Sequence, residues 1–367
     1  MTGTLPSQDI RALLQGGVIR AGDPEVEARV QPASLDLALG AEAWVMPGSL
    51  LPLAGERIEA LLEAYAHRRV DLSTPQILQR GHVYVARLSE TLALPAQLAA
   101  YANAKSSIGR IDVLARVLTD GNPRYDKVSP GYEGRLYIEI VPKSFDVVAR
   151  AGDTLSQMIF YGERDVLETR ELEALRSETP LLYAHDGQPL PASSQWGGHE
   201  VWMTLDLDQE IVGWKAKKHY VPLDLQKVRG HDPRDYFEPL ARPKGQALFL
   251  SREAFYIFST AERVVVPPEY AVEMLPYDTS AGEFRAHYAG FFDPGFGWPT
   301  EGPVRGAPAV LEVRPYEDDL LVRHRQPVCR MAYERLTQTP DRLYGVGSHY
   351  AAQEGPHLSK LFEVSPC

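Results

Sequence analysis

The chain has 367 residues with a formal net charge of −11, and 44% of its residues are hydrophobic. This composition is that of an ordinary globular protein, and the length suggests two domains. Because nucleic-acid polymers are bound by basic surfaces, the charge argues against such a partner, whereas a small anionic ligand needs only a few local cations. No apolar run is long enough to span a membrane, and residues 1–9 lack the features of a signal peptide, so we expect a cytoplasmic protein with no membrane partner.

The two cysteines, Cys329 and Cys367, are too few for a disulfide framework and fit a reducing compartment. Nucleoside deaminases of another fold activate water with a zinc ion held through Cys-x-x-Cys and His-x-Glu motifs. This chain has no Cys-x-x-Cys, and neither cysteine stands near a His-x-Glu. We therefore expect no zinc and no other metal held by the protein itself.

In chain order, the first thirty residues favour a helix after a cap at Ser7. Strand patterns follow at residues 30–40, 77–95, 145–148 and 155–160, with a short helix or irregular segment at 96–104 and a helix or extended arm at 163–175. Asp36 lies in the first of these strands, where we expect a structural role rather than catalysis. Short strands at close spacing with turn signals between them predict an all-β barrel or jelly roll with minor helices.

A polar stretch spans residues 105–140. It begins KSSIGR, passes through a turn-rich run and ends in a strand that places Tyr137 and Glu139 on one face. A β-meander would fold the cations and hydroxyls of KSSIGR over the carboxylate and form a polar pocket. The residues alone leave a plainer alternative open: Glu139 forms a solvated pair with Arg135, and Ser106 or Ser107 caps a short helix over 108–114.

The second half of the chain repeats the first, and a segment rich in Pro, Gly and Ser at residues 178–198 reads as the linker. Leu35, Asp36 and Leu37 recur as Leu205, Asp206 and Leu207; Tyr84, Glu90 and Pro95 recur as Tyr256, Glu262 and Pro267; and Glu139, Met158 and Phe160 correspond to Glu312, Met331 and Tyr333. The nearly constant offset predicts two copies of one β-fold, residues 1–190 and 191–367.

Four motifs resemble those of the dCTP deaminase and dUTPase family. They are residues 30–40 (VQPASLDLALG), 105–110 (KSSIGR), 130–140 (PGYEGRLYIEI) and 348–362 (SHYAAQEGPHLSKLF). The resemblance implies two tandem dUTPase-like β-barrel or jelly-roll domains, the first with intact motifs, in a homo-oligomer for which a trimer is favoured. Family members have sites between subunits, over which the last motif closes. The implied reaction is deamination of dCTP to dUTP and ammonia, which feeds pyrimidine deoxynucleotide synthesis.

The resemblance also implies roles for individual residues. Glu139 would act as general base and then as acid, while Ser106 and Arg110 position the water and stabilise the developing charge. The backbone of Tyr137 and Ile138 would read the cytosine edge. The remaining implied nucleotide-binding positions are Lys105, Ser107, Ile108, Gly109, Ser129, Tyr350 and Gln353. Mg²⁺ would bind to the triphosphate of the nucleotide rather than in a protein cage.

The chain departs from the family pattern at several positions. Ser129 stands where the family has an Asp that contacts the deoxyribose. In the second copy, residues 277–282 (YDTSAG) replace KSSIGR, so that both cations are lost and Asp278 is gained, which would repel a triphosphate. The second copy keeps Asp293 in its Asp-Pro-Gly turn. Whether Asp293 contributes to the site of the first copy stays open. His349 stands where relatives often have Lys.

Two other functions stay open at this point. One is a dUTPase-type pyrophosphatase or a bifunctional enzyme that cleaves dUTP as well, for which the family usually supplies the Asp that Ser129 replaces. The other is a non-catalytic nucleotide-binding protein, against which the intact set of Glu139, Ser106 and Arg110 stands. Besides dCTP, the candidate ligands are dUTP and dTTP, the latter as a feedback inhibitor.

Overall fold

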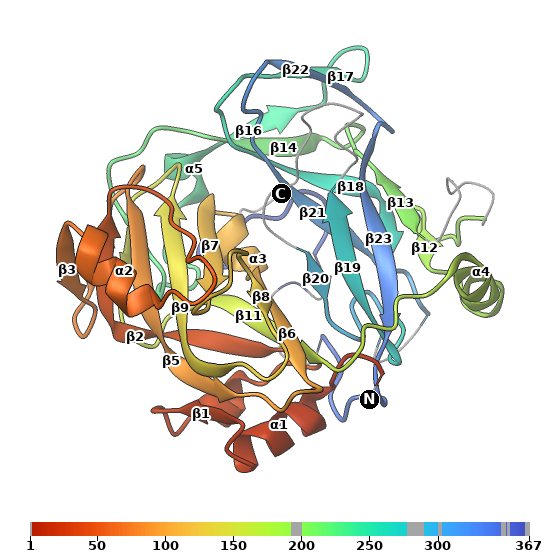
Figure 1. Ribbon diagram of the computed structural model, residues 1–367. Coiled ribbons are helices and arrows are strands. Elements are labelled where there is room, and N and C mark those ends of the chain that lie inside the picture. Colours follow the sequence, from red (N-terminus) through yellow and green to blue (C-terminus); the bar gives the residue numbers. More distant parts are fainter. Residues whose placement is uncertain are drawn as a thin grey trace. The chain divides into compact units, whose positions relative to one another are not determined.

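The protein is described here by a computed structural model that covers residues 2–191, 200–276, 290–299, 303–345, 350 and 353–363 (Figure 1). Strands account for 42% of it and helices for 12%, which confirms the all-β class with minor helices. Among the helices so described, none combines the length and the apolar character that crossing a membrane requires.

The chain divides into two compact units. Unit 1 contains Met1–Glu163, Lys218–Pro233 and Ser359–Cys367, and unit 2 contains Arg164–Lys217 and Arg234–Leu358. The division after residue 163 differs from the expected boundary at 190. The physical reason is that β12 (Leu182–Tyr183) pairs with β18 (Tyr256–Val264), while α4 (Thr169–Glu178) buries Leu172 in the core of unit 2.

Unit 1 is built on a large sheet that has nine strands within the described residues, in the order β7-β9-β5-β2-β11-β6-β8, with β1 beside β5 and β3 beside β2. These strands are β1 (Ile19–Ala21), β2 (Leu35–Met46), β3 (Arg68–Asp71), β5 (Val83–Ala93), β6 (Ala99–Ala104), β7 (Val113–Leu118), β8 (Lys127–Val128), β9 (Glu133–Pro142) and β11 (Thr154–Tyr161). A smaller sheet pairs β4 (Gln76–Leu78), β10 (Val147–Ala149) and β15 (Leu223–Asp224). The helices are α1 (Ser7–Gln15), the 3-10 helix η1 (Val26–Arg29), α2 (Ile58–Tyr65) and α3 (Ser106–Gly109).

Three local expectations for unit 1 are wrong. Residues 99–104 form strand β6, because pairing with β11 over six positions overrides the weak strand preference of alanine. Helix α1 has Pro6 as its N-cap, with no side-chain cap from Ser7. Helix α3 ends at Gly109 and neither Ser106 nor Ser107 caps it, since residues 113–118 are drawn into β7 by pairing with β9.

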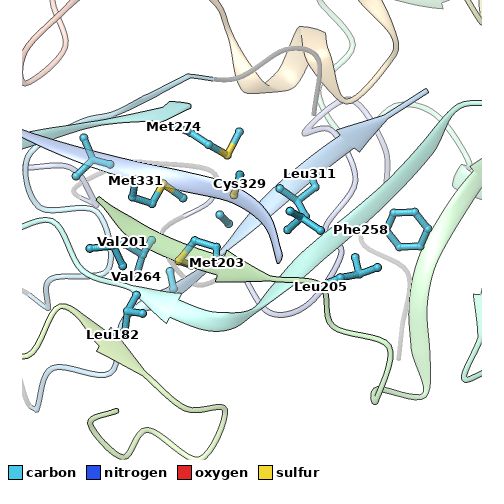
Figure 2. Packing of buried hydrophobic residues seen from close by; sticks show 14 of the residues in the cluster. Leu182, Val201, Met203, Leu205, Phe258, Val264, Met274, Leu311, Cys329 and Met331 are labelled. Carbon is cyan, nitrogen blue, oxygen red and sulfur yellow. The ribbon is translucent and has the colours of Figure 1, made fainter. Parts of the chain in front are cut away.

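Unit 2 contains three sheets among the described residues: β12-β18-β14-β16 with β21 against β18, β13-β23-β19-β20, and the pair β17-β22. Their remaining bounds are β13 (Val201–Thr204), β14 (Ile211–Ala216), β16 (Phe237–Ala241), β17 (Ala247–Leu250), β19 (Tyr270–Pro276), β20 (Phe291–Phe292), β21 (Ala307–Val313), β22 (Leu320–Arg323) and β23 (Pro327–Arg335), and a short helix α5 covers Pro233–Tyr236. Figure 2 shows side chains from strands of both larger sheets, among them Phe258 and Cys329, meeting in one buried core.

The strand register repeats between the units, although the expected match of Leu35 with Leu205 is wrong. Leu35 lies opposite Met158 in unit 1, whereas Val201 lies opposite the equivalent Met331 in unit 2. In unit 1, β5 pairs with β9 so that Val85 lies opposite Glu139. In unit 2, β18 pairs with β21 so that Ile257 lies opposite Glu312. The two glutamates therefore occupy equivalent positions in the two copies, and both side chains are buried.

Candidate active site

Glu139 is a buried carboxylate in the large sheet of unit 1. It lies on β9 between β7 and β5 and is 0% exposed. Arg116 forms an ion pair with its Oε1, and Ser49 Oγ donates a 3.2 Å hydrogen bond to the same oxygen. Tyr125 donates a 3.1 Å hydrogen bond to Oε2. A buried carboxylate with donors on both oxygens is stabilised against the cost of burial and is held in one orientation.

The backbone explains why these groups meet. Arg116 lies directly opposite Glu139 in the antiparallel register of β7 and β9, where cross-strand side chains are neighbours. Tyr125 lies in the loop between β7 and β8, and the next residue, Asp126, anchors this loop to Val117 of β7. Asp126 N–H donates to Val117 O at 2.9 Å, and Val117 N–H donates to the Asp126 carboxylate at 2.7 Å. The loop therefore carries the phenol to the carboxylate.

Burial raises the pKa of Tyr125 to about 12, and the neighbouring Glu139 carboxylate acts in the same direction. The phenol therefore stays a neutral donor at any ordinary working pH. Burial likewise raises the pKa of Tyr137 to about 12, and that side chain packs in a cluster with Met46 and Leu118 instead of at a solvated surface. The Arg116 guanidinium lies 3.7 Å from the centre of the Tyr125 ring, a favourable cation–π stack.

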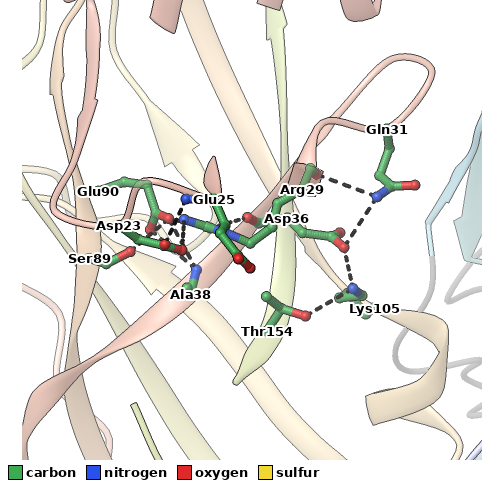
Figure 3. A network of polar contacts seen from close by, with 10 residues as sticks. All are labelled: Asp23, Glu25, Arg29, Gln31, Asp36, Ala38, Ser89, Glu90, Lys105 and Thr154. Carbon is green, nitrogen blue, oxygen red and sulfur yellow. Dashed lines mark hydrogen bonds and ion pairs between the residues drawn. The ribbon is translucent and has the colours of Figure 1, made fainter. Parts of the chain in front are cut away.

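A second polar cluster surrounds Lys105, the residue before α3 (Figure 3). Its ammonium group forms an ion pair with Asp36 on β2 and donates a 3.0 Å hydrogen bond to Thr154 on β11. Gln31 approaches the same carboxylate at 3.5 Å. Figure 3 also shows Glu90, which forms an ion pair with Arg29, beside this group. Lys105 thus links Asp36 on β2 to Thr154 on β11, and this use of the Asp36 carboxylate is in keeping with a structural role.

The C-terminal residues of unit 1 reach the same motif. Ser359 Oγ donates a 2.8 Å hydrogen bond to the backbone oxygen of Ser107. Burial lowers the pKa of Lys360, and the charge of Lys105 lowers it further, while Asp36 acts in the opposite direction. Two cations therefore share the electrostatic environment of one carboxylate, which makes this the more positive side of the candidate site.

The structure places the expected site residues in separate groups. Ser106 and Arg110 contact each other, with a 3.0 Å hydrogen bond from the guanidinium to the hydroxyl. Within the described residues, neither is among the hydrogen-bond partners of Glu139. Ser107, Ile108 and Gly109 are buried in α3, Ile138 is buried in β9, and Ser129 is exposed before the turn that leads into β9. Tyr350 and Gln353 belong to unit 2, where Gln353 donates a 2.6 Å hydrogen bond to Pro308 O.

Sequence reasoning missed the three partners of Glu139. Arg116 carried a signal, because it is a lone charge inside the apolar run 113–118 and such charges need a partner when buried. Tyr125 and Ser49 carried none, since both lie in turn-rich segments whose fold-back depends on tertiary contacts. The plain alternative for Glu139 is wrong: its partner is Arg116, while Arg135 approaches Glu59 at 3.7 Å.

The second copy retains the buried Glu312 on β21, and Asp293 is also buried. Residues 277–282 with Asp278, and His349, lie outside the described residues. In the part of the chain that is described, no group of three or more His, Cys, Asp or Glu side chains is arranged to hold a metal ion.

Family models match both halves of the chain. The model of the 2'-deoxycytidine 5'-triphosphate deaminase N-terminal domain matches residues 1–164, and that of the C-terminal domain matches residues 168–362. The fold is similar to the crystal structure of 2'-deoxycytidine 5'-triphosphate deaminase from Agrobacterium tumefaciens, with a TM-score of 0.85 and 40% identity over 94% of this chain and 98% of that one.

Curated relatives match a smaller share of the chain. A protein of Methanothermobacter thermautotrophicus named "dCTP deaminase, dUMP-forming" is 30% identical over 37% of this chain and 66% of its own length. A "dCTP deaminase" of Haloarcula marismortui is 28% identical over 41% of this chain and 75% of its own length. A "dCTP deaminase, dUMP-forming" of Methanosphaera stadtmanae is 28% identical over 56% of this chain and 95% of its own length.

Proposed function

Because the chain belongs to the 2'-deoxycytidine 5'-triphosphate deaminase family, we propose that it hydrolyses dCTP to dUTP and ammonia, with Glu139 of unit 1 as the proton-transferring group. The observation that carries this proposal is the fully buried Glu139 carboxylate, held by Arg116, Tyr125 and Ser49 at the position of the family motif. A carboxylate fixed in this way can accept and return a proton without reorienting.

In the proposed mechanism, the water that attacks C4 of cytosine gives a proton to Glu139, and Glu139 passes it to the ring nitrogen N3. The adduct then loses its amino group as ammonia, while Glu139 relays a proton to it from the new hydroxyl group. The carbonyl of uracil forms and Glu139 ends as it began. No metal is needed at the base in this scheme.

Ser106 and Arg110 are proposed to position the water and to stabilise the charge that develops on it. Since the described hydrogen-bond partners of Glu139 are Ser49, Arg116 and Tyr125, Ser106 and Arg110 would act on the Glu139 of a neighbouring copy, which suits a homo-oligomer, with a trimer favoured. The backbone of Tyr137 and Ile138 would read the cytosine edge.

The phosphates are proposed to lie near Lys105 and Ser107, where Lys360 adds a second cation. Mg²⁺ would arrive with the triphosphate. Tyr350 and Gln353 would contribute from the C-terminal motif, and Ser129 would replace the family Asp at the sugar with a hydroxyl that can donate or accept.

Product analysis tests the reaction. The purified protein is incubated with dCTP and Mg²⁺, with and without a zinc chelator, and the nucleotides are separated by chromatography. We expect dUTP to accumulate in both tubes. Unchanged dCTP in both would refute the deaminase and favour a nucleotide-binding protein.

The same experiment decides on a bifunctional enzyme. Relatives whose names include "dUMP-forming" favour this second candidate, whereas Ser129 at the Asp position disfavours it. Formation of dUMP and pyrophosphate from dCTP would establish it, and a parallel tube with dUTP as substrate would show cleavage independent of deamination.

A further inference from the structure

The two oxygens of Glu139 have different surroundings. Oε1 accepts from both Arg116 and Ser49, and Arg116 also donates to Ser49 Oγ at 3.3 Å, so the three groups form a closed ring of contacts. In the described part of the chain, the hydrogen-bond donor to Oε2 is Tyr125. A carboxylate oxygen has room for about two donors, so Oε2 can accept from one more group than the phenol.

From this asymmetry we infer that Arg116 and Tyr125 are positioning residues for Glu139, with Arg116 fixing Oε1 and Tyr125 directing Oε2 toward the attacking water. The inference rests on the proposed deamination and adds which residues hold the Glu139 carboxylate in the orientation that accepts the proton. Arg116 suits the role because its guanidinium is planar, permanently charged and braced against the Tyr125 ring at 3.7 Å. Rotation of the carboxylate would break both contacts to Oε1 at once.

Tyr125 suits its role because it can release Oε2. Its hydroxyl lies 3.5 Å from Leu50 O, a second acceptor, as well as 3.1 Å from Oε2. When Oε2 takes the proton of the water and no longer needs a donor, the phenol O–H can turn toward Leu50 O. Since burial raises the pKa of Tyr125 to about 12, the phenol keeps its own proton throughout.

The loop that carries Tyr125 is anchored well enough for such a role. Ile58 N–H donates to the Asp120 carboxylate at 2.8 Å, and Gly121 N–H donates to Glu56 O at 2.8 Å. With the paired contacts between Asp126 and Val117, the loop is held at both ends. A group that acts by position needs such support.

Steady-state kinetics of Arg116→Met, Arg116→Lys and Tyr125→Phe test the inference, with Arg135→Met as the matched control on β9. We expect Arg116→Met to lower kcat about 100-fold and Tyr125→Phe about tenfold, with KM for dCTP changed less than about threefold. Arg116→Lys should recover part of the lost kcat, because lysine restores the positive charge but not the planar guanidinium with its several donors. The control should keep the wild-type kcat, because Arg135 lies at the surface, 49% exposed.

Binding in a second background separates positioning from direct contact with the nucleotide. In Glu139→Gln, addition of Arg116→Met should leave the Kd for dCTP unchanged. A weaker Kd there, or variants with raised KM and unchanged kcat, would overturn the inference. Thermal unfolding shows whether the Arg116→Met variant folds. If that variant does not fold, Arg116→Lys and Tyr125→Phe take its place, and an unchanged kcat in both of them would overturn the inference. A wild-type protein that makes no dUTP would refute the proposed function itself, which is measured first.

Discussion

Ser359 Oγ donates a 2.8 Å hydrogen bond to the backbone oxygen of Ser107, a residue 252 positions earlier in the chain. The neighbouring backbone is held as well: Arg229 N–H donates to Lys360 O at 2.9 Å, and Phe362 forms a parallel bridge with His231. The end of the second sequence repeat is therefore docked at the KSSIGR motif within unit 1.

Loss of this hydrogen bond should weaken substrate binding more than chemistry. Ser359→Ala leaves the buried Ser107 carbonyl without this donor, at a cost of about 1 kcal/mol, and loosens the segment that would face the phosphates. We expect KM for dCTP to rise about fivefold at nearly constant kcat. The control is Ser177→Ala, whose hydroxyl donates to Glu173 O at the same 2.8 Å on the surface of α4. Equal KM values in the two variants would contradict the prediction.

The Asp36 and Lys105 pair should behave as a structural ion pair. Both side chains are largely buried, so Asp36→Asn should lower the free energy of unfolding by roughly 3 kcal/mol, since one buried charge is left uncompensated. The double variant Asp36→Asn with Lys105→Met should recover part of that loss. Urea denaturation of the single and double variants checks this. Additive losses would show that the residues do not act as a pair.

Asp126 should make stability fall as the pH rises from acid toward neutral. Burial raises the pKa of its carboxyl to about 7, although Val117 N–H acts in the opposite direction. The folded protein then binds this proton more tightly than the unfolded chain, so the contribution is full below about pH 4 and is lost by about pH 7. Asp126→Asn keeps the acceptor for Val117 and removes the titration.

Thermal unfolding of this variant at two pH values gives the measurement. Relative to wild type, Asp126→Asn should be more stable at about pH 8 and nearly equal at about pH 4. Asp71→Asn is a suitable control, because hydrogen bonds from Ser73 lower the pKa of that exposed carboxyl and the variant should show no gain at the higher pH. The same difference at both pH values would argue against Asp126 as the titrating group.

Cys329 should be unreactive in the folded protein. It is 0% exposed in the core of unit 2, and burial raises the pKa of its thiol, so the reactive thiolate is suppressed (Figure 2). Iodoacetamide should leave Cys329 unlabelled in buffer and label it in urea, as read by mass spectrometry of the peptide that contains it. Labelling in buffer at the rate seen in urea would contradict the burial.

The sequence predicted those parts of the fold that are encoded locally. Alternating apolar residues in the expected strands were enough for the all-β class. The repeat offset matched Glu139 with Glu312 correctly, but it matched Leu35 with Leu205, four residues away from Val201, which holds the equivalent place in the strand register. Strand β6 escaped prediction because its Ala-rich sequence has little strand preference of its own, and the partner strands β11 and β8 supply the reason for it. The boundary after Glu163 was not predicted, because the Pro-rich segment near residue 190 is a strong local signal for a linker, whereas the pairing of β12 with β18 has no local signal.

The candidate site was predicted in part for the same reason. Glu139 and Lys105 stand in contiguous motifs, so short-range patterns and family resemblance point to them. Arg116, Tyr125 and Ser49 meet Glu139 only through strand register and loop closure, which the order of residues does not reveal. The hydrogen bond between Ser359 and Ser107 joins residues 252 positions apart, so local sequence patterns do not reveal it.

A matched pair of variants tests whether Glu139 is the proton-transferring group. Glu139 and Glu312 occupy equivalent, fully buried positions in the two copies, so Glu139→Gln and Glu312→Gln make the same chemical change in the two units. Formation of dUTP from dCTP is measured for both and for the wild type. We predict that Glu139→Gln abolishes the product and that Glu312→Gln retains it. Undiminished dUTP formation in Glu139→Gln would contradict the role of Glu139, and loss of the product in Glu312→Gln as well would place the chemistry in unit 2.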